Sequence, residues 1–423
     1  MKVLFLGYAI SMKEASKLYG ASIAGNKMQI NVLKQLSRYG DLALRCITIY
    51  PTAAYPKGRL FIRRKRIRLF RGFYSIRVGF LNLPVIKQFL ETIVTYLEAR
   101  KIVKDEGIKT IFTFNLFPQV GLPAKWLKRR YGCELICLLA DLPIDDAVGR
   151  KGISYILRKS FDHLTLKLFA SYDKFITLNK HAISRYAPGK NYIVVEGGID
   201  PKEATTENAI NHYADIINKR DYHKASDISS SQPTDESCNH KMKRIVYSGA
   251  LTQYSGIIEL IEAMKYIKEK EVFLDIYGDG PLAKDVREYT GINKNIRYHG
   301  SIHYSLMRQI QREAYLLVNP RPVDHPIARV TFPSKLFEYM LSGVPVLTTR
   351  LNGLTEEYLD KLFVVQTDDA ISLGMKINQI LMLPEEMLRE KAEEARKFIL
   401  EHKTWEKQCE RIYQFIMAGE YNS

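Results

Sequence analysis

The sequence predicts an α/β protein made of two doubly wound, Rossmann-like domains. Its 423 residues are enough for two domains of ordinary size, and 46% hydrophobic residues suffice for two cores. Strand-length apolar runs alternate with helical patterns in both halves, which is typical of parallel sheets. A polar stretch separates the halves. We therefore expect a first domain over residues 1–200, a linker or surface excursion over 201–243 and a second domain over 244–400.

The first domain is expected to hold six strands with helices between them. Residues 27–39 and 85–103 repeat apolar side chains at helical spacing, for example Phe89, Ile93 and Leu97. The strands are predicted from the apolar runs VLFLG at 3, LRCITIY at 44, TIFTF at 110, ELICLLA at 134, KFITL at 174 and NYIVVEGG at 191. Because helices separate these runs, the strands are expected to be parallel.

A second alternating series starts at Arg244. It predicts strands at RIVYSG, VFLDIYG, IRYHG and LLVNP, with the helices IIELIEAMKYI and LMRQIQREA between them. Residues 385–421 also have a helical pattern, anchored by apolar residues such as Trp405 and Ile412. We expect the part over 401–423 to pack back toward the first domain. Ligands of doubly wound sheets bind at the carboxyl ends of the strands, so the loops after these strands are candidate sites.

The positive charge belongs to the first half of the chain. Residues 1–200 contain 34 Lys and Arg against 14 Asp and Glu, whereas the remainder contains 29 against 32. Such an asymmetry predicts that an N-terminal surface meets an anionic partner: nucleic acid, an acidic membrane leaflet or a phosphorylated lipid.

The densest basic run is Lys57 to Arg77, with nine basic residues, no acidic one and interleaved aromatic residues. This mixture suits a membrane interface, and the side chains expected to contact a membrane are Arg63, Arg64, Lys65, Arg66, Arg68 and Arg71. The alternative is a pair of strands with solvated arginines, because IRLF and SIRVGF alternate around Gly72. The strands are expected under either interpretation.

The five cysteines, at positions 46, 133, 137, 238 and 409, have no metal-ligand spacing and fit a reducing compartment. The N-terminus MKVLFLGYA is interpreted as a first strand and not as a signal peptide, because charged residues follow its short apolar run. No segment has the apolar length needed to span a bilayer. We expect a cytoplasmic protein that contacts the inner face of the cell membrane peripherally.

The most informative segment is Phe332 to Thr349, FPSKLFEYMLSGVPVLTT. Pro333 suits a first helical turn, so that Ser334 and Lys335 lie at a helix start that favours an anion. Glu338 lies one turn further on the same face and is expected to reach hydroxyl groups of a ligand whose phosphates rest on the helix start. Gly343 is expected to end this helix, and VPVLTT to form a strand buried on both faces.

Three other loops of the second domain have residues suited to a nucleotide sugar. In SGALTQYSG, Gly249 and Gly256 allow the backbone to approach a ligand closely. IYGDGPL forms a tight turn, for which a purely structural explanation is equally open. In HGSIHY, backbone and ring surface are available to a base, although a lone His is more often structural. The candidate donor-binding residues of the second and third loops are Gly278, Gly280, Gly300, His303 and Tyr304.

In their order along the chain, these four loops resemble the group 1 glycosyltransferases, which are retaining enzymes of the GT-B fold with a cleft between two domains. The resemblance covers Arg244 to about Val365 and extends to the first half only in layout. The segment FPSK-EYM-SG-PVL is most similar to members that assemble bacterial capsule, exopolysaccharide and O-antigen. The resemblance implies a nucleotide-sugar donor, with Glu338 on the ribose, Phe332 to Lys335 on the diphosphate and Gly300 to Tyr304 around the base.

Two departures from the family pattern affect the donor site. The family often has a second glutamate at the position of Val330, and an Arg and a Lys at the positions of Ala250 and Ser255. Lys335 and Arg321 are the candidate catalytic cations that compensate, because the departing diphosphate requires positive charge or backbone dipoles. The resemblance implies that the leaving phosphate takes up the acceptor proton, and neither a metal ion nor another cofactor is predicted.

The first domain is expected to supply the acceptor side. Gly7, Gly20 and Gly25 surround the loop after the first strand, which resembles the glycine-rich acceptor loop of the family without its adjacent glycines. Asp141 ends a strand in LLADLP, and the resemblance implies a position near the donor sugar. The alternative for Asp141 is a turn residue before Pro143.

The sequence therefore predicts a retaining hexosyltransferase that moves a sugar from a nucleotide-diphosphate sugar, expected to be UDP-linked, to a lipid-linked or growing saccharide in bacterial surface polysaccharide synthesis. One alternative is a non-catalytic or epimerase-like GT-B protein. A basic nucleic-acid-binding protein is another, but the sequence lacks base-stacking or groove-reading motifs, so no nucleic acid is expected as a partner.

Overall fold

The computed structural model describes residues 1–15, 17–18, 22–84, 86–142, 153–201, 242–325 and 332–418. The chain divides into two compact units. Unit 1 comprises Met1–Gly197, Val330–Phe332 and Trp405–Ser423, and unit 2 comprises Gly198–Arg329 and Pro333–Thr404. Residues 202–241 of the expected linker lie outside the described residues.

Unit 1 is built on an eight-stranded sheet with the order β10-β9-β8-β7-β1-β2-β5-β4. All neighbouring strands are parallel except β4 and β5, which form an antiparallel hairpin. The strands are β1 (Lys2–Gly7), β2 (Ala43–Thr48), β4 (Lys65–Phe70), β5 (Phe73–Arg77), β7 (Thr110–Phe114), β8 (Glu134–Leu139), β9 (Lys174–Thr177) and β10 (Asn191–Val194). A separate antiparallel pair joins β3 (Phe61–Ile62) to β6 (Phe80–Leu81).

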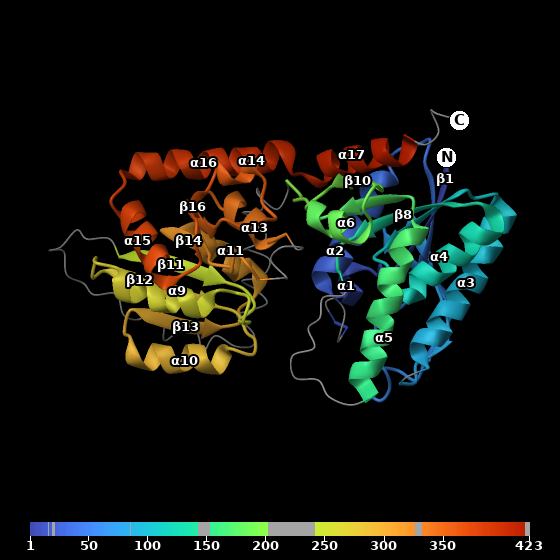
Figure 1. Ribbon diagram of the computed structural model, residues 1–423, viewed down its shortest axis with the longest axis horizontal. Coiled ribbons are helices and arrows are strands. Elements are labelled where there is room, and N and C mark those ends of the chain that lie inside the picture. The colour runs from blue at the N-terminus through green and yellow to red at the C-terminus, as the bar shows by residue number, and fades with distance from the viewer. Residues whose placement is uncertain are drawn as a thin grey trace. The chain divides into compact units, whose positions relative to one another are not determined.

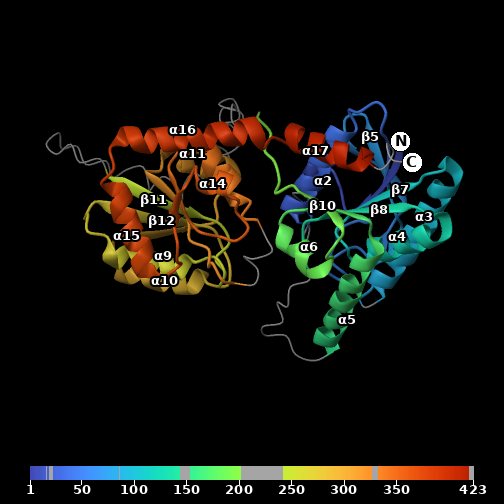
Figure 2. The same ribbon diagram turned by 45° about the horizontal axis from the view of Figure 1, so that its top comes forward.

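Helices cover both faces of this sheet, because alternate residues of each central strand point to opposite sides. Val3 and Phe5 of β1 pack with α2 and α17, whereas Leu4 and Leu6 pack with α3 and α4. Figures 1 and 2 show α17 alongside α2, although almost the whole chain separates them. The helices are α1 (Met12–Ala15), α2 (Ile23–Leu36), α3 (Lys87–Glu106), α4 (Pro118–Tyr131), α5 (Ile153–Leu168), α6 (Lys180–Tyr186) and α17 (Trp405–Met417), with the 3₁₀ turn η1 (Phe169–Ser171).

Unit 2 is built on a six-stranded parallel sheet with the order β13-β12-β11-β14-β15-β16. Its strands are β11 (Lys243–Ser248), β12 (Val272–Tyr277), β13 (Ile296–Gly300), β14 (Leu316–Asn319), β15 (Val346–Thr349) and β16 (Phe363–Val365). All four residues of β15 are buried, as the apolar run VPVLTT predicts for a central parallel strand.

The helices of unit 2 also lie on two faces. Ile245 and Tyr247 of β11 pack with α9 and α15, whereas Ser248 on the opposite face bonds to Tyr339 of α13. In Figure 1, α13 and α16 lie on the side of the sheet away from α9. The helices are α9 (Ile257–Ala263), α10 (Ala283–Ile292), α11 (Tyr304–Glu313), α13 (Lys335–Leu341), α14 (Glu356–Leu359), α15 (Ala370–Leu381) and α16 (Glu385–His402), with the 3₁₀ turn η3 (Met264–Tyr266).

Each sheet has one point at which the strand order reverses. In unit 1 the chain moves outward from β1 to β2 on one side and from β7 to β8 on the other, so the switch lies between β1 and β7. In unit 2 the switch lies between β11 and β14 for the same reason. Ligands of doubly wound sheets bind beside such a switch point, at the carboxyl ends of the strands.

The structure confirms the prediction of two Rossmann-like α/β units and the expected strands around Gly72. The helical pattern predicted over residues 385–421 corresponds to two helices, α16 and α17. The helix breaks between α16 and α17, where the Ile199 N–H donates to the Lys403 carbonyl and Thr404 forms a β-bridge with Ile199. The backbone groups at the break are therefore engaged outside a helix.

The apolar spacing that predicts α3 does not mark its buried face. Phe89 and Leu97 are 66% and 54% exposed, while Glu91, Thr92 and Thr95 are buried. Two of these polar side chains are satisfied within the helix, because Thr92 donates to the Gln88 carbonyl and Glu91 pairs with Lys87. Among the described residues, no helix combines the length and the apolar character needed to span a bilayer.

Candidate functional site

The loop after β11 is held in close contact with the loop after β14. Gly256 has a φ of 71°, and a Cβ atom there would lie 1.6 Å from the carbonyl oxygen of Pro320. Gly249 opens the loop, and a Cβ atom there would lie 1.9 Å from Nζ of Lys335. Glycine is needed at both positions, because any side chain would displace the neighbouring loop or the lysine. These contacts lie at the switch point of unit 2.

Lys335 points its ammonium group into this loop. Its Nζ lies 4.2 Å from the centre of the Tyr247 ring, so a cation–π contact holds the amine in place. Burial and the nearby Arg321 lower the pKa of Lys335 to about 7, although Glu338 opposes this shift. Burial disfavours the charged form of an amine, and a second cation adds to the effect.

Arg321 follows β14 and forms the second cation of the site. Its carbonyl accepts a hydrogen bond from the Thr349 hydroxyl, which fixes the loop to β15. Burial lowers the pKa of Arg321, while Tyr247 and Tyr254 oppose that shift. Within the described ranges, neither Arg321 nor Lys335 has a carboxylate within salt-bridge distance. Two neighbouring cations without a paired anion favour the approach of a negatively charged ligand.

A buried hydrogen-bond network positions α13, the helix that carries Lys335. The Tyr339 hydroxyl accepts from the Ser248 N–H at 2.9 Å and lies 3.2 Å from both the carbonyl and the hydroxyl of Ser248. Gln311 of α11 donates to the Ser248 hydroxyl at 3.1 Å. Because these groups are buried, breaking the network leaves polar atoms unsatisfied. The network therefore fixes α13 to the carboxyl end of β11.

The loops after β11, β12 and β13 are joined by backbone hydrogen bonds. The Gly249 N–H donates to Tyr277, the Leu251 N–H donates to Asp279, and the Gly278 N–H donates to Gly300. A Cβ atom on Gly278 would lie 1.8 Å from the Gly249 carbonyl oxygen, and one on Gly280 would lie 2.4 Å from that of Leu251. Gly278 and Gly280 therefore have the structural role that the sequence left open.

The remaining donor-side residues predicted from sequence lie around this core. The helix begins at Lys335, two residues after Pro333, so Pro333 lies before the first helical turn. Phe332 and Pro333 are buried, whereas Ser334 is exposed and its side chain makes no cap. Glu338 lines a recess of about 20 Å³ that Arg308 and Arg312 also line. His303 is exposed, and Tyr304 begins α11, where only its backbone is described. Val330 lies outside the described residues.

An ion-pair network across β11, β12 and β13 was not predicted from the sequence. Asp275, 1% exposed, lies 2.7 Å from Arg244 Nε and 2.8 Å from His299 Nε2. Burial raises the pKa of Asp275, but His299 and Arg244 outweigh it and leave the pKa below its usual value. His299 also stacks on Tyr277 with ring centres 4.5 Å apart. To predict that these residues lie side by side, the register of the three strands must be known, and residue spacing in the sequence does not provide it.

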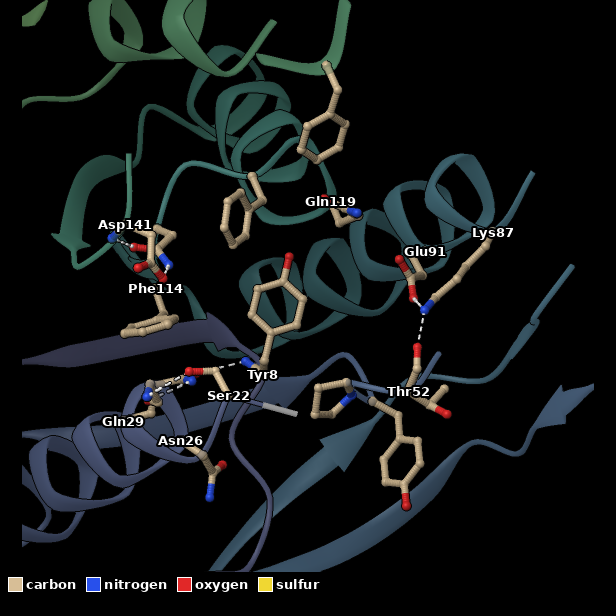
Figure 3. Close-up of a pocket in the computed structure, with 16 residues that line it drawn as sticks. Tyr8, Ser22, Asn26, Gln29, Thr52, Lys87, Glu91, Phe114, Gln119 and Asp141 are labelled. Atoms are coloured by element: carbon tan, nitrogen blue, oxygen red, sulfur yellow. Dashed lines mark hydrogen bonds and ion pairs between the residues drawn. The ribbon is translucent and has the colours of Figure 1, made fainter. Parts of the chain in front are cut away.

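In unit 1, a cavity of about 340 Å³ lies at the switch point. Gly25 and Asp141 line it, whereas Gly7 lies against Gln29 and Phe5. Gly20 lies outside the described residues. Asp141 accepts a hydrogen bond of 3.1 Å from Asn115 Nδ2, and burial raises the pKa of Asp141 despite this bond. Figure 3 shows this cavity.

Asn115 positions Asp141, and the sequence analysis missed it. It has a φ of 61°, and its side-chain oxygen accepts hydrogen bonds from the N–H groups of Ala140 and Asp141. Asn tolerates this left-handed conformation better than most residues. An Asn directly after the strand TIFTF is a signal that would have identified the position. Asn115 therefore connects the loops after β7 and β8.

The basic residues predicted to face a membrane lie on and around the β4–β5 hairpin. Arg63, Arg64, Lys65, Arg66, Arg68 and Arg71 are all exposed. Some already have partners: Arg64 forms a two-pronged ion pair with Glu98 of α3, and Arg66 lies over the Tyr74 ring at 4.5 Å. The described residues contain no group of three or more His, Cys, Asp or Glu side chains suited to a metal ion.

The comparisons with known proteins place this geometry in a recognised fold. Residues 242–382, which lie within unit 2, match the family model described as "Glycosyl transferases group 1". The sucrose-phosphate synthase from Thermosynechococcus elongatus superposes with a TM-score of 0.66 at 16% identity, covering 100% of both chains. No curated protein matches this chain by sequence.

Two further solved structures have the same arrangement. The apo form of WaaB, a lipopolysaccharide outer core galactosyltransferase, superposes with a TM-score of 0.63 at 12% identity over 99% of this chain and all of that one. HepE from Anabaena, solved in complex with UDP and glucose, superposes with a TM-score of 0.61 at 13% identity over 99% and 100%. The chain therefore has the GT-B fold, and residues 242–382 are similar to the group 1 glycosyl transferase family.

Proposed function

We propose that this protein is a retaining glycosyltransferase that transfers a sugar from a UDP-sugar to a lipid-linked or growing saccharide in bacterial surface polysaccharide synthesis. The observation that carries the proposal is the pair of partly buried cations, Lys335 and Arg321, without a paired carboxylate among the described residues. A nucleoside diphosphate supplies the anionic charge that this pair lacks. The family match of the surrounding residues supports the same class of ligand.

The cations act on the leaving group of the transfer. The bond between the anomeric carbon of the sugar and the diphosphate oxygen breaks, and its electron pair stays on the diphosphate. The acceptor hydroxyl forms the new bond on the same face of the sugar, and its proton passes to the leaving phosphate. Positive charge held in position beside the developing phosphate anion lowers the barrier, because no reorganisation is needed during the reaction.

The choice of donor and acceptor rests on similar proteins. HepE is solved with UDP and with UDP-glucose, and WaaB and WaaG belong to lipopolysaccharide synthesis by their descriptions. We assign the ribose contact to Glu338, which lies one helical turn from Lys335. The reaction requires no metal ion in this proposal, since Lys335 and Arg321 supply the charge.

Peripheral contact with an anionic membrane completes the proposal. Exposed Arg63, Lys65, Arg68 and Arg71 provide positive charge on unit 1, and Phe61 is 67% exposed in the strand beside them in sequence. Basic and aromatic side chains together favour the lipid headgroup region. This surface would hold the enzyme near a lipid-linked acceptor at the inner face of the membrane.

A thermal-shift screen of nucleotide sugars tests the donor assignment. A donor that binds the folded state raises the apparent melting temperature by mass action, so UDP-sugars are expected to stabilise the protein more than GDP- or ADP-sugars. Lys335→Met should weaken UDP binding and lower turnover by about 100-fold, the effect typical of removing one group that stabilises a developing anion.

Lys361→Met is the matched control, because Lys361 lies in unit 2 at the surface and pairs with Glu394. It should leave nucleotide binding unchanged. Full UDP affinity in Lys335→Met, or stabilisation by no nucleotide sugar in the wild-type protein, would contradict the proposal.

A further inference from the structure

The ladder between β11 and β14 ends before β11 does, at the switch point of unit 2. Among the described residues, it pairs Ile245 and Val246 with Leu316 and Leu317, whereas β11 continues to Ser248. Ser248 is only 7% exposed, so its backbone N–H and carbonyl need partners inside the protein. The pairing with β12, on the other edge of β11, continues through Ser248. The two strands that flank the switch point therefore separate at the last residue of β11.

The hydroxyl of Tyr339 supplies the partners that a neighbouring strand would otherwise give. It accepts a hydrogen bond of 2.9 Å from the Ser248 N–H and donates one of 3.2 Å to the Ser248 carbonyl. Tyr339 belongs to α13 and is 0% exposed. One phenol oxygen thus satisfies both backbone groups of the last strand residue. The end of β11 is thereby bonded to α13.

The polar groups around Ser248 can all be satisfied in one order. Gln311 Nε2 of α11 donates to the Ser248 hydroxyl at 3.1 Å, and a carboxamide nitrogen can only donate. Ser248 Oγ lies 3.2 Å from the Tyr339 oxygen, so its own proton can bond there. Tyr339 then donates its proton to the Ser248 carbonyl. Gln311 therefore orients the Tyr339 hydroxyl through Ser248.

The contact between Tyr339 and Ser248 lies beside the contact between Lys335 and Gly249. Lys335 lies about one helical turn before Tyr339, and Gly249 directly follows Ser248. A Cβ atom on Gly249 would lie 1.9 Å from Lys335 Nζ, so the backbone and the amine are in close contact. Because helix and strand are joined one turn away, the position of the amine in the loop depends on the bonds between Tyr339 and Ser248.

We propose that Tyr339 and Gln311, acting through Ser248, are positioning residues that hold the Lys335 amine against the loop after β11 and so set the affinity of this site for a diphosphate. The inference rests on the proposed function for the identity of the anion. Tyr339 and Gln311 are 0% and 2% exposed, so they act without touching the ligand. A merely structural role would lower the stability of the fold and leave the surroundings of the amine unchanged.

The pKa of Lys335 reports the position of its amine without any ligand. Among the described residues, the charged and titratable groups around the amine are Tyr247 of β11, Arg321 after β14 and Glu338 of α13. Burial is the largest cause that lowers the pKa of Lys335 to about 7, ahead of Arg321. If α13 is released from Ser248, water reaches the amine and this pKa rises toward its ordinary value.

Two substitutions in the full-length chain test the network. Tyr339→Phe removes the phenol oxygen, and Gln311→Met keeps a side chain of similar length without its donor. Each should raise the pKa of Lys335 in the ligand-free protein, measured by NMR of ¹³C-labelled lysine with the signal assigned by its absence in Lys335→Met. Each should also weaken UDP binding by about three- to tenfold, the range for one hydrogen bond.

Tyr266→Phe and Gln309→Met are the matched controls. Both side chains are exposed in unit 2, and Gln309 lies on the same helix as Gln311. The controls should change neither the pKa of Lys335 nor the affinity for UDP. Because both network residues act on one serine, the double variant of Tyr339→Phe and Gln311→Met should weaken UDP binding by less than the product of the two single effects.

Stability is measured separately from the position of the amine. Tyr339→Phe takes the partner from the Ser248 N–H and is expected to be less stable, so circular dichroism checks that it is folded at the titration temperature. If it does not fold, Gln311→Met carries the test, because it removes a single hydrogen bond. An unchanged pKa of Lys335 with unchanged UDP affinity in folded Gln311→Met, or a fully multiplicative loss in the double variant, would overturn the proposal.

The outcome is separable from that of the donor proposal. A wild-type protein that binds no UDP would refute the donor assignment, while the pKa of Lys335 in the two variants would still decide the role of the network. Normal UDP binding by the wild type, with the pKa of Lys335 and the UDP affinity unchanged in both variants, would refute only the positioning role.

Discussion

At the scale of single residues, the charged form of Lys335 is destabilised in the free protein, and a bound anion would stabilise it. Burial and the nearby Arg321 disfavour its charged form until an anion arrives. Lys335 was predictable from sequence because it begins a short helix after an apolar strand. The burial of its amine in the loop was not predictable, because that burial depends on how closely the backbone of Gly249 approaches the amine.

Lys335 should make the affinity for UDP depend on pH. In the free protein the pKa of Lys335 is about 7, and a bound diphosphate raises this pKa by stabilising the charged form. Below pH 7 the amine is already charged, so it adds no pH dependence. Above pH 7 binding takes up a proton, so affinity should fall by up to about tenfold per pH unit.

Calorimetric titration of UDP at pH 7, 8 and 9 measures this slope, and buffers of different ionisation enthalpy reveal the proton uptake. Lys335→Met should abolish the slope, and Lys361→Met should retain it. An unchanged slope in Lys335→Met would assign the pH dependence to another group.

The residues that line the cavity of unit 1 could be predicted from the sequence only in part. Asp141 was predictable because it directly follows an apolar strand. Glu91 was not, because an acid within an apolar helical repeat is normally assigned to the exposed face, whereas α3 buries Glu91 and exposes Phe89. Only the packing of α3 against α4 and the cavity reveals which face of the helix is buried.

At the scale of elements, glycine positions hold the donor site together. The loop Gly249 to Gly256 can lie against Pro320 only because no side chain intervenes. Gly256→Ala is therefore expected to destabilise the protein by about 3 kcal/mol or more, because it combines a left-handed backbone with a direct clash. Urea unfolding measures the change.

Gly291→Ala is the matched control for that substitution. Gly291 lies within α10 and has no atom within 4 Å of the position of an added Cβ. Alanine is favoured over glycine in a helix, so this variant should be as stable as the wild type or more stable by about 0.5–1 kcal/mol. Equal stability of Gly256→Ala and the wild type would show that the loop can move away from Pro320.

Most individual elements followed from the sequence, since strand-length apolar runs separated by helical repeats leave few alternatives. The break between α16 and α17 did not. Helical spacing continues through Lys403 and Thr404, and only the bridge to Ile199, distant in sequence, ends the helix there. Contacts of this kind leave no local signal.

At the scale of the whole molecule, charge is concentrated at one end of the chain. The excess of basic residues over 1–200 should bring the protein to vesicles that contain anionic lipid at low salt, with weaker binding at 0.5 M salt because the ions screen the attraction. Co-sedimentation with vesicles of phosphatidylglycerol and phosphatidylethanolamine measures the bound fraction.

Replacing Arg63, Lys65, Arg68 and Arg71 together by Gln should reduce vesicle binding by about 100-fold or more, since each exposed basic residue near an anionic surface contributes roughly 1 kcal/mol. The corresponding change of four surface basic residues in unit 2, Lys284, Arg287, Lys376 and Arg389, should have little effect. Equal loss in both variants would indicate a general charge effect and not a surface on unit 1.

The placement of α17 has a consequence for how the polypeptide matures on the ribosome. Trp405, Cys409, Ile412 and Ile416 complete the core that contains Val3 and Phe5, yet the whole of unit 2 is translated between these two groups of residues. Unit 2 can therefore fold while the β1–α2 face of unit 1 still lacks its cover. A nascent chain that has emerged only as far as α16 exposes this apolar face, and a chaperone that shields it would act in that interval.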